Sequence, residues 1–259
     1  MKQRYRHSIY RIGLAIIAAL TLLYSTIASA QKIDPKRFSD PVITPGSPPS
    51  FDDFKPALQI VLNRMVESYS KGESNPLQVV VLDKEVPSIK NFIEASKPQI
   101  QSSIDRHDVI VVNFHSEARF NGKQTSACMV EYDSVRRRDL LSGYESFFMS
   151  RDDVLYYIAA HEFGHCMADH QATFGKAKHL DSYAHELLAD RVAITFFMIN
   201  GREKSAARIV EFNHQMEPGS IHHHPQELAS FQSVLKERSA EFSIQNVKSM
   251  FDVYKIAAE

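Results

Sequence analysis

Two histidines, His161 and His165, stand four residues apart inside an apolar stretch, and this pair constrains the fold more than any other feature of the sequence. Ser150 is a good helix N-cap, and Asp153 three residues later completes a variant of the capping box. Residues four apart share one face of a helix, so both imidazole rings can reach a single ion at about 2.0–2.1 Å. The sequence therefore predicts a metal-binding helix; the alternative is a surface helix that carries two histidines by chance.

Glu162 directly follows the first histidine, so its carboxylate is expected beside the ion rather than behind it. A carboxylate in that place can accept a proton from a water whose pKa the ion lowers. The pattern His-Glu-x-x-His is typical of hydrolytic zinc sites for this reason. We predict His161 and His165 as zinc ligands and Glu162 as the general base.

A hydrolytic zinc site with two histidines needs one more protein ligand. The extended metzincin spacing requires glycine at position 168 and histidine at position 171, where this chain has Ala168 and Gln171. His170 lies five residues beyond His165 and is expected to point off the shared face, which makes it a weak candidate.

A better third ligand lies on a second predicted helix, over residues 181–200. Glu186 and Asp190 are four residues apart there and share a face. Glu186 can complete a tetrahedral site, and Asp190 can accept the Nδ1–H of a ligand histidine. Alternatively, Glu186 pairs with Lys178 or Arg191 on a solvated face.

The pattern His-Glu-x-x-His, followed by Glu-x-x-Ala-Asp on the next helix, resembles the gluzincin peptidases. It is most similar to the minigluzincin core shared by the CaaX-protease and HtpX-like metallopeptidases. The resemblance implies one zinc ion bound by His161, His165 and Glu186. It also implies that Glu162 is the base and that Asp190 orients His161.

The likeness covers roughly residues 152–201, and relatives often carry a Ser/Thr-His-Pro stretch further on. This chain has His223-His224-Pro225 there, without the Ser or Thr. The resemblance implies that His224 stabilises the oxyanion of a tetrahedral intermediate or occludes the zinc in a latent form. The alternative is that residues 222–224 form a polar loop that caps the final helix. The remaining histidines of this half are interpreted as surface residues: His179, His185 and His214.

Residues 1–30 have the features of a secretory signal. An apolar run over residues 12–24 is preceded by four basic residues and followed by Ala28-Ser29-Ala30, which predicts cleavage after Ala30. An uncleaved membrane anchor is the alternative. The cleaved chain keeps 26 basic and 31 acidic residues, a net charge of −5, so it has no basic field for a nucleic acid. The absence of the several apolar spans of the membrane-embedded relatives favours a soluble periplasmic or secreted form.

Export would allow a disulfide between the two cysteines, Cys128 and Cys166. Two buried free thiols are the alternative, because the sequence does not fix the distance between their Cα atoms.

The rest of the chain predicts an α+β fold, a small N-terminal β-sheet packed on a helical zincin core with an active-site helix and a third-ligand helix. A Pro-rich arm over residues 31–56 precedes the metallopeptidase domain at 57–259. The expected strands are 78–82, 108–113 and 127–132, with a turn at Asn121-Gly122, and the other expected helices are 57–70, 203–216 and 226–258. In related folds a strand near the metal helix pairs with substrate, which implies that residues 127–132 form a wall of the cleft.

Taken together, the sequence predicts an exported zinc metallopeptidase of the endopeptidase kind that acts on proteins or peptides of the cell envelope. An envelope protein partner is left open. The rival hypothesis is a non-catalytic or latent exported zinc-binding protein that retains a peptidase core, with the Pro-rich arm or the His224 loop as the blocking segment.

Overall fold

The computed structural model describes residues 54–70, 75, 77–83, 111–114, 119–120, 123–124, 126–132, 143–144, 147–148, 150–239 and 246–259. The predicted signal sequence at 1–30 and residues 31–53 of the Pro-rich arm lie outside these residues. Within the part of the chain that is described, no helix is both long enough and apolar enough to span a membrane.

The sheet contains the three strands that the sequence predicted, with shifted ends. β1 (Leu77–Asp83) runs parallel to β5 (Ser126–Tyr132), and β2 (Val111–Phe114) pairs with β5 in the antiparallel sense, so the strand order is β1-β5-β2. Two shorter strands, β3 (Arg119–Phe120) and β4 (Lys123–Gln124), pair antiparallel on either side of the predicted Asn121-Gly122 turn. The α+β class is therefore confirmed.

Six helices accompany the sheet in the described residues, and several of their ends lie within two residues of the predicted ones. They are α2 (Phe54–Ser70), α5 (Arg151–Thr173), α6 (Ser182–Ile199), α7 (Glu203–His214), α8 (Pro225–Glu237) and α9 (Met250–Ala258). The Ser150 hydroxyl caps α5 by accepting from the Asp153 N–H, and Asp181 caps α6 by accepting from the Ala184 N–H. Gly201 follows α6 with a φ of 69°, the left-handed conformation that glycine adopts at little cost.

Two predicted boundaries were wrong. α2 begins at Phe54, three residues before the predicted start, and it includes Pro56 in its first turn, where the missing N–H of proline is not needed. The single helix predicted over residues 226–258 is two helices, α8 and α9. The Ser249 hydroxyl accepts from the Asp252 N–H and starts α9 as a separate element.

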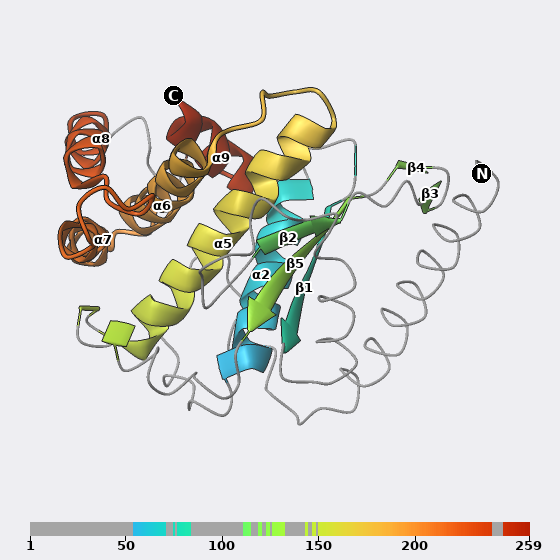
Figure 1. The fold of residues 1–259 in the computed structure, drawn as a ribbon, viewed down its shortest axis with the longest axis horizontal. Helices are drawn as coiled ribbons and strands as arrows, with labels where there is room; N and C mark the ends of the chain where they lie inside the picture. The colour runs from blue at the N-terminus through green and yellow to red at the C-terminus, as the bar shows by residue number, and fades with distance from the viewer. Residues whose placement is uncertain are drawn as a thin grey trace.

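Helix α5 lies at the centre of the fold (Figure 1). It packs between α2 and the sheet on one side and α6 on the other, and α6 in turn contacts α7, α8 and α9. Nearly every residue of α5 from Asp153 to Ala172 is buried, which explains why this helix shows no clear polar face. The two predicted site helices, α5 and α6, are therefore neighbours in the core.

The central place of β5 contradicts one expectation. β1 pairs with β5 along its whole length, and β2 pairs with residues 127–130 on the other side. A strand whose two edges are already paired has few N–H and C=O groups left for an extended substrate. Residues 127–130 therefore have no free edge with which to pair with a substrate, contrary to the expectation for this strand.

A buried polar cluster joins α2 to the far end of α5. The Tyr69 Oη lies 2.9 Å from Nδ1 of His170, and the Gln171 side chain donates a hydrogen bond to the same Oη. Tyr69 and His170 are almost completely buried. His170 is thus occupied in the core and is not part of the metal-ligand cluster in the described residues, in line with its being a weak candidate for a ligand.

The two cysteines form a disulfide. Cys128 of β5 and Cys166 of α5 are both fully buried, and their Cα atoms are 5.6 Å apart. The bond resolves the alternatives left open by the sequence, and it joins the metal helix to the central strand one residue after His165.

Removing this bond by the double substitution Cys128→Ala and Cys166→Ala is expected to lower the free energy of unfolding by about 3–4 kcal/mol. The reason is that the cross-link closes a loop with a sequence separation of 38 residues and so restricts the unfolded chain. Urea titration without reductant measures the loss, and added reductant should destabilise the wild type but not the variant. Equal midpoints for the two proteins would contradict the expectation.

Candidate metal centre

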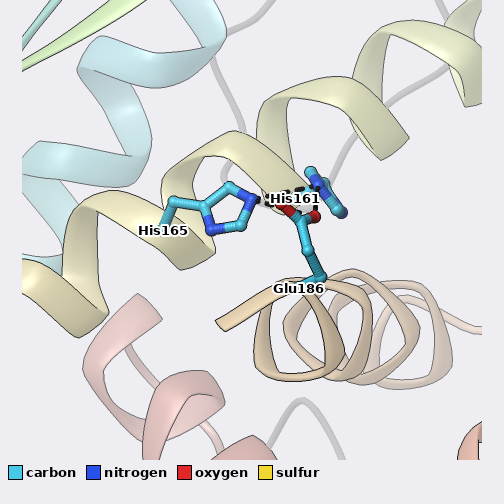
Figure 2. Close-up of side chains that lie close together, drawn as sticks. All are labelled: His161, His165 and Glu186. Carbon is cyan, nitrogen blue, oxygen red and sulfur yellow. Dashed lines mark hydrogen bonds and ion pairs between the residues drawn. The ribbon is translucent and has the colours of Figure 1, made fainter. Parts of the chain in front are cut away.

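Three side chains from two helices converge on one point (Figure 2). The Nε2 atoms of His161 and His165 on α5 are 3.2 Å apart. Oε2 of Glu186 on α6 lies 3.3 Å from the first nitrogen and 3.4 Å from the second. The three ligand atoms therefore form a nearly equilateral triangle that can hold a metal ion.

The close approach of α5 and α6 brings Glu186 to the histidines. Gly164 stands at the crossing, where a Cβ atom would lie 2.8 Å from the Cα of Ala189 and 3.3 Å from Cβ of Val192. Only glycine fits against the backbone of α6 at this distance, since real Cβ contacts are longer. Gly164 of the histidine motif and Ala189 of Glu-x-x-Ala-Asp thus allow α5 and α6 to pack closely against each other.

The triangle is mostly shielded from solvent but not sealed. The side chains of His161, His165 and Glu186 are 13%, 7% and 12% exposed, respectively. Burial lowers the pKa of His165 to about 4, although the charge of Glu186 opposes this. Burial acts to raise the pKa of Glu186, but the charge of His165 and hydrogen bonds from neighbouring histidines outweigh it and hold the pKa well below its usual range. At neutral pH these two ligands are thus in the neutral and anionic forms that bind a metal.

Glu162 is buried beside the triangle and is not part of it. Its side-chain Oε2 has no hydrogen-bond partner among the described residues. Burial raises the pKa of Glu162 to about 8; the charges of Glu186 and Asp190 act in the same direction, and that of His161 opposes them. A carboxylate with a raised pKa and an unused oxygen is suited to accept a proton.

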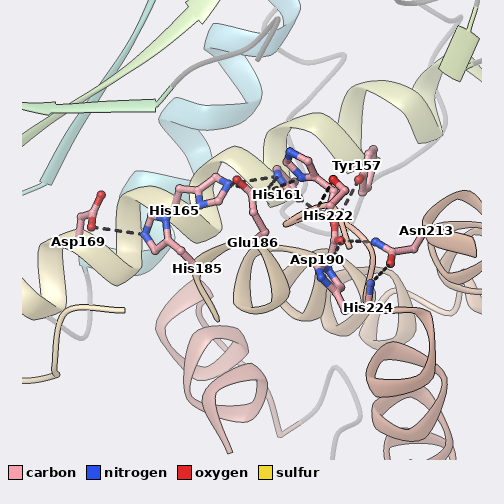
Figure 3. Close-up of polar contacts among 11 residues, drawn as sticks. Tyr157, His161, His165, Asp169, His185, Glu186, Asp190, Asn213, His222 and His224 are labelled. Atoms are coloured by element: carbon pink, nitrogen blue, oxygen red, sulfur yellow. Dashed lines mark hydrogen bonds and ion pairs between the residues drawn. The ribbon is translucent and has the colours of Figure 1, made fainter. Parts of the chain in front are cut away.

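Asp190 is the centre of a buried hydrogen-bond network (Figure 3). Its Oδ1 lies 2.8 Å from Nδ1 of His161 and accepts from the Tyr157 hydroxyl at 3.1 Å. Its Oδ2 accepts from Nδ2 of Asn213 at 3.0 Å and lies 2.9 Å from Nε2 of His224. The carboxylate thus contacts four donors, and it holds His161 with Nε2 turned toward the triangle, as predicted for Asp190.

The same carboxylate explains the protonation of its neighbours. Burial acts to lower the pKa of His161, but the charge of Asp190 and their hydrogen bond outweigh it, and the pKa is raised well above its usual value. Burial also raises the pKa of Tyr157, and Asp190 adds to the shift, so this phenol stays a donor. For Asp190 itself, burial is outweighed by His161 and His224, and the pKa falls to about 2.

His224 does not lie where the predicted roles require it. Its side chain is fully buried, and Nε2 contacts Oδ2 of Asp190 rather than the open side of the triangle. Its backbone N–H donates to Oδ1 of Asn213 at 2.6 Å. A fully buried ring behind Asp190 cannot reach a substrate oxyanion or cover the ion. His224 is the N-cap residue of α8, as the alternative of a capping loop expects, but its side chain makes no cap hydrogen bond.

His222 comes closer to the metal triangle than His224. Its Nδ1 lies 3.2 Å from Oε2 of Glu186, and its side chain is 24% exposed. The sequence places three consecutive histidines in this loop, and nothing in their pattern distinguishes the one that contacts Glu186.

His185 is also part of the site, although it was predicted to be a surface residue. Its ring packs on that of His165, with centroids 4.5 Å apart, and the two Nδ1 atoms are 3.0 Å apart. Its Nε2 lies 3.4 Å from Oδ1 of Asp169. Asp169 lies four residues after His165 on the same helix face. This spacing was the sequence signal that could have indicated a polar contact beside His165.

Comparisons with known proteins do not identify the chain. No protein-family model, no curated protein and no solved structure gives a significant match. The functional assignment therefore depends on the geometry of the site, and the cluster of His161, His165 and Glu186 is its centre.

Proposed function

We propose that this chain is a zinc-dependent metallopeptidase. The observation that carries the proposal is the triangle of two imidazole nitrogens and one carboxylate oxygen, with sides of 3.2, 3.3 and 3.4 Å. A tetrahedral ion bound at about 2.0–2.1 Å needs ligand atoms about 3.3 Å apart. The triangle thus has the dimensions of one face of a zinc tetrahedron.

The donor set also fits zinc. Two histidines and one glutamate are the protein ligands of one class of catalytic zinc site, whereas structural sites have four protein ligands, usually with cysteine. The two cysteines of this chain are bonded to each other and take no part. Three protein ligands leave a coordination position for water or substrate, which is what a hydrolase needs.

The side chains around the triangle support a hydrolytic reaction. A bound zinc ion supplies Lewis acidity, which polarises the scissile carbonyl and lowers the pKa of the attacking water. Glu162 accepts the proton from that water and then delivers it to the amine leaving group. An ion bound at Nε2 of His161 would take the place of the proton there, and Asp190 would accept from the Nδ1–H that remains and hold the ring in place.

The spacing of the motifs supports a peptidase of the gluzincin type. Glu186 and Asp190 occupy the positions that the resemblance to minigluzincins implied, one as a member of the triangle and the other as the partner of His161. We extend the proposal to an exported, periplasmic or secreted endopeptidase with protein or peptide substrates. The signal sequence predicted over residues 1–30 is the reason for proposing export.

The proposal is tested by metal content and chelation. We expect one zinc per chain by mass spectrometry, and hydrolysis of labelled casein that phenanthroline abolishes and added zinc restores. His161→Ala should lose both zinc and activity, whereas His179→Ala, at an exposed loop position, should keep both. Hydrolysis that is insensitive to chelation would overturn the proposal. One zinc per chain without hydrolysis would instead favour the non-catalytic zinc-binding protein.

A further inference from the structure

The two ligand histidines have different partners on their outer nitrogens (Figure 3). Nδ1 of His161 contacts the Asp190 carboxylate, which is almost completely buried. Nδ1 of His165 lies 3.0 Å from Nδ1 of His185, a second imidazole. No described carboxylate contacts His165 directly on that side; Asp169 contacts the far nitrogen of His185 instead.

Metal binding at His165 determines which ring nitrogens carry protons in the contacts from His165 through His185 to Asp169. A ligand imidazole that uses Nε2 for the ion carries its proton on Nδ1. His165 therefore donates, and Nδ1 of His185 must be the acceptor. A neutral His185 then carries its proton on Nε2, the nitrogen that lies 3.4 Å from the Asp169 carboxylate. The contact between His165 and His185 thus has one donor and one acceptor only when His185 is in this form, and its Nε2 then faces the Asp169 carboxylate in a polar contact that is not a hydrogen bond.

We propose that His185 is a positioning residue, which fixes the tautomer and ring orientation of the ligand His165 and is itself oriented by Asp169. This inference rests on the proposed metal site. Two consecutive residues of α6 then have separate roles: Glu186 binds the ion, and His185 orients the ligand His165. Outer partners of this kind change metal affinity by about 10–100-fold when they are removed.

A pair of substitutions separates this role from packing. His185→Phe keeps a ring against His165 but removes the acceptor. His185→Asn loses part of the ring but keeps an oxygen close to the position of Nδ1. We expect the zinc dissociation constant, measured by competition with a chromophoric chelator, to rise about 10–100-fold in His185→Phe. His185→Asn should bind zinc nearly as tightly as the wild type, and His214→Phe, on the exposed end of α7, should match the wild type.

A spectroscopic readout reports the hydrogen bond itself. In the zinc-loaded protein with labelled histidine, the Nδ1–H proton of His165 should resonate downfield in the wild type and in His185→Asn, and it should lose that shift in His185→Phe. Melting curves of the metal-free proteins establish that each variant is folded.

The outcomes distinguish this inference from the proposed function. Stoichiometric zinc in the wild type with an unchanged dissociation constant in His185→Phe would overturn the role of His185 and leave the metal site intact. Equal weakening by His185→Phe and His185→Asn would also overturn it, because the ring and not the acceptor would then matter. A wild type that binds no zinc would overturn both.

Discussion

Replacing Glu162 with glutamine is expected to lower the turnover number of the zinc-loaded protein by about 10²–10⁴-fold, while the zinc stoichiometry stays the same. Glutamine has the size and shape of glutamate, so the packing around this buried side chain is kept. Its amide cannot accept the proton of the attacking water and so cannot deliver it to the leaving amine, and these are the two steps assigned to Glu162. Zinc binding is retained because residue 162 is not a member of the ligand triangle.

The measurement is peptide hydrolysis at saturating substrate, together with zinc content on the same samples. Glu237→Gln is the matched control, since it makes the same chemical change at an exposed position of α8. A Glu162→Gln protein with full zinc and wild-type turnover would remove Glu162 from the mechanism. Loss of zinc together with activity would instead make Glu162 part of the ligand set.

Replacing Asp190 with alanine is expected to lower the free energy of unfolding of the metal-free protein by about 3–5 kcal/mol. The substitution leaves four donors without their acceptor, and the residues that carry them are mostly buried: Tyr157, His161, Asn213 and His224. Unpaired polar groups in the core cost far more than exposed ones because no water replaces the lost partner. The network also joins α5, α6 and α7 to the start of α8, so its loss affects most of the helical half.

Urea titration in the presence of a chelator measures this effect without a contribution from bound metal. Asp181→Ala on the same helix is the control, because it removes an exposed N-cap that is worth about 1 kcal/mol. A loss no larger than that of the control would contradict the expectation.

The dependence on pH has a defined sign for Asp190. Its pKa is about 2 in the folded protein, below the value of about 3.9 of an unfolded aspartate. Its contribution to stability is therefore complete above the unfolded pKa and is lost as the pH falls through the folded pKa. The difference in the free energy of unfolding between the wild type and Asp190→Ala should accordingly become smaller as the pH falls from about 4 toward 2.

The periodicity of the sequence predicted the residues that share a helix face. His161 and His165, and then Glu186 and Asp190, were placed correctly because a spacing of four fixes their common direction on each helix. Ser150, a good cap residue, similarly located the start of α5.

The contacts between elements could not be predicted in this way. His185 points from α6 toward His165 only because the two helices cross at Gly164, and the crossing depends on tertiary packing. Asn213 and His224 reach Asp190 from α7 and from the start of α8, whose positions no local pattern defines. The pairing of β5 on both edges likewise depends on the order of strands in the sheet, which alternation of side chains does not determine.

The helix crossing at Gly164 has a consequence for how much variation the motif can tolerate. In the general pattern His-Glu-x-x-His, the third and fourth positions are open to any residue. In this protein Phe163 is fully buried with its ring packed edge-on against Tyr69, and Gly164 has no room for a side chain. All five consecutive residues are therefore under constraint: three by the proposed metal chemistry, one by the core and one by the distance between two backbones.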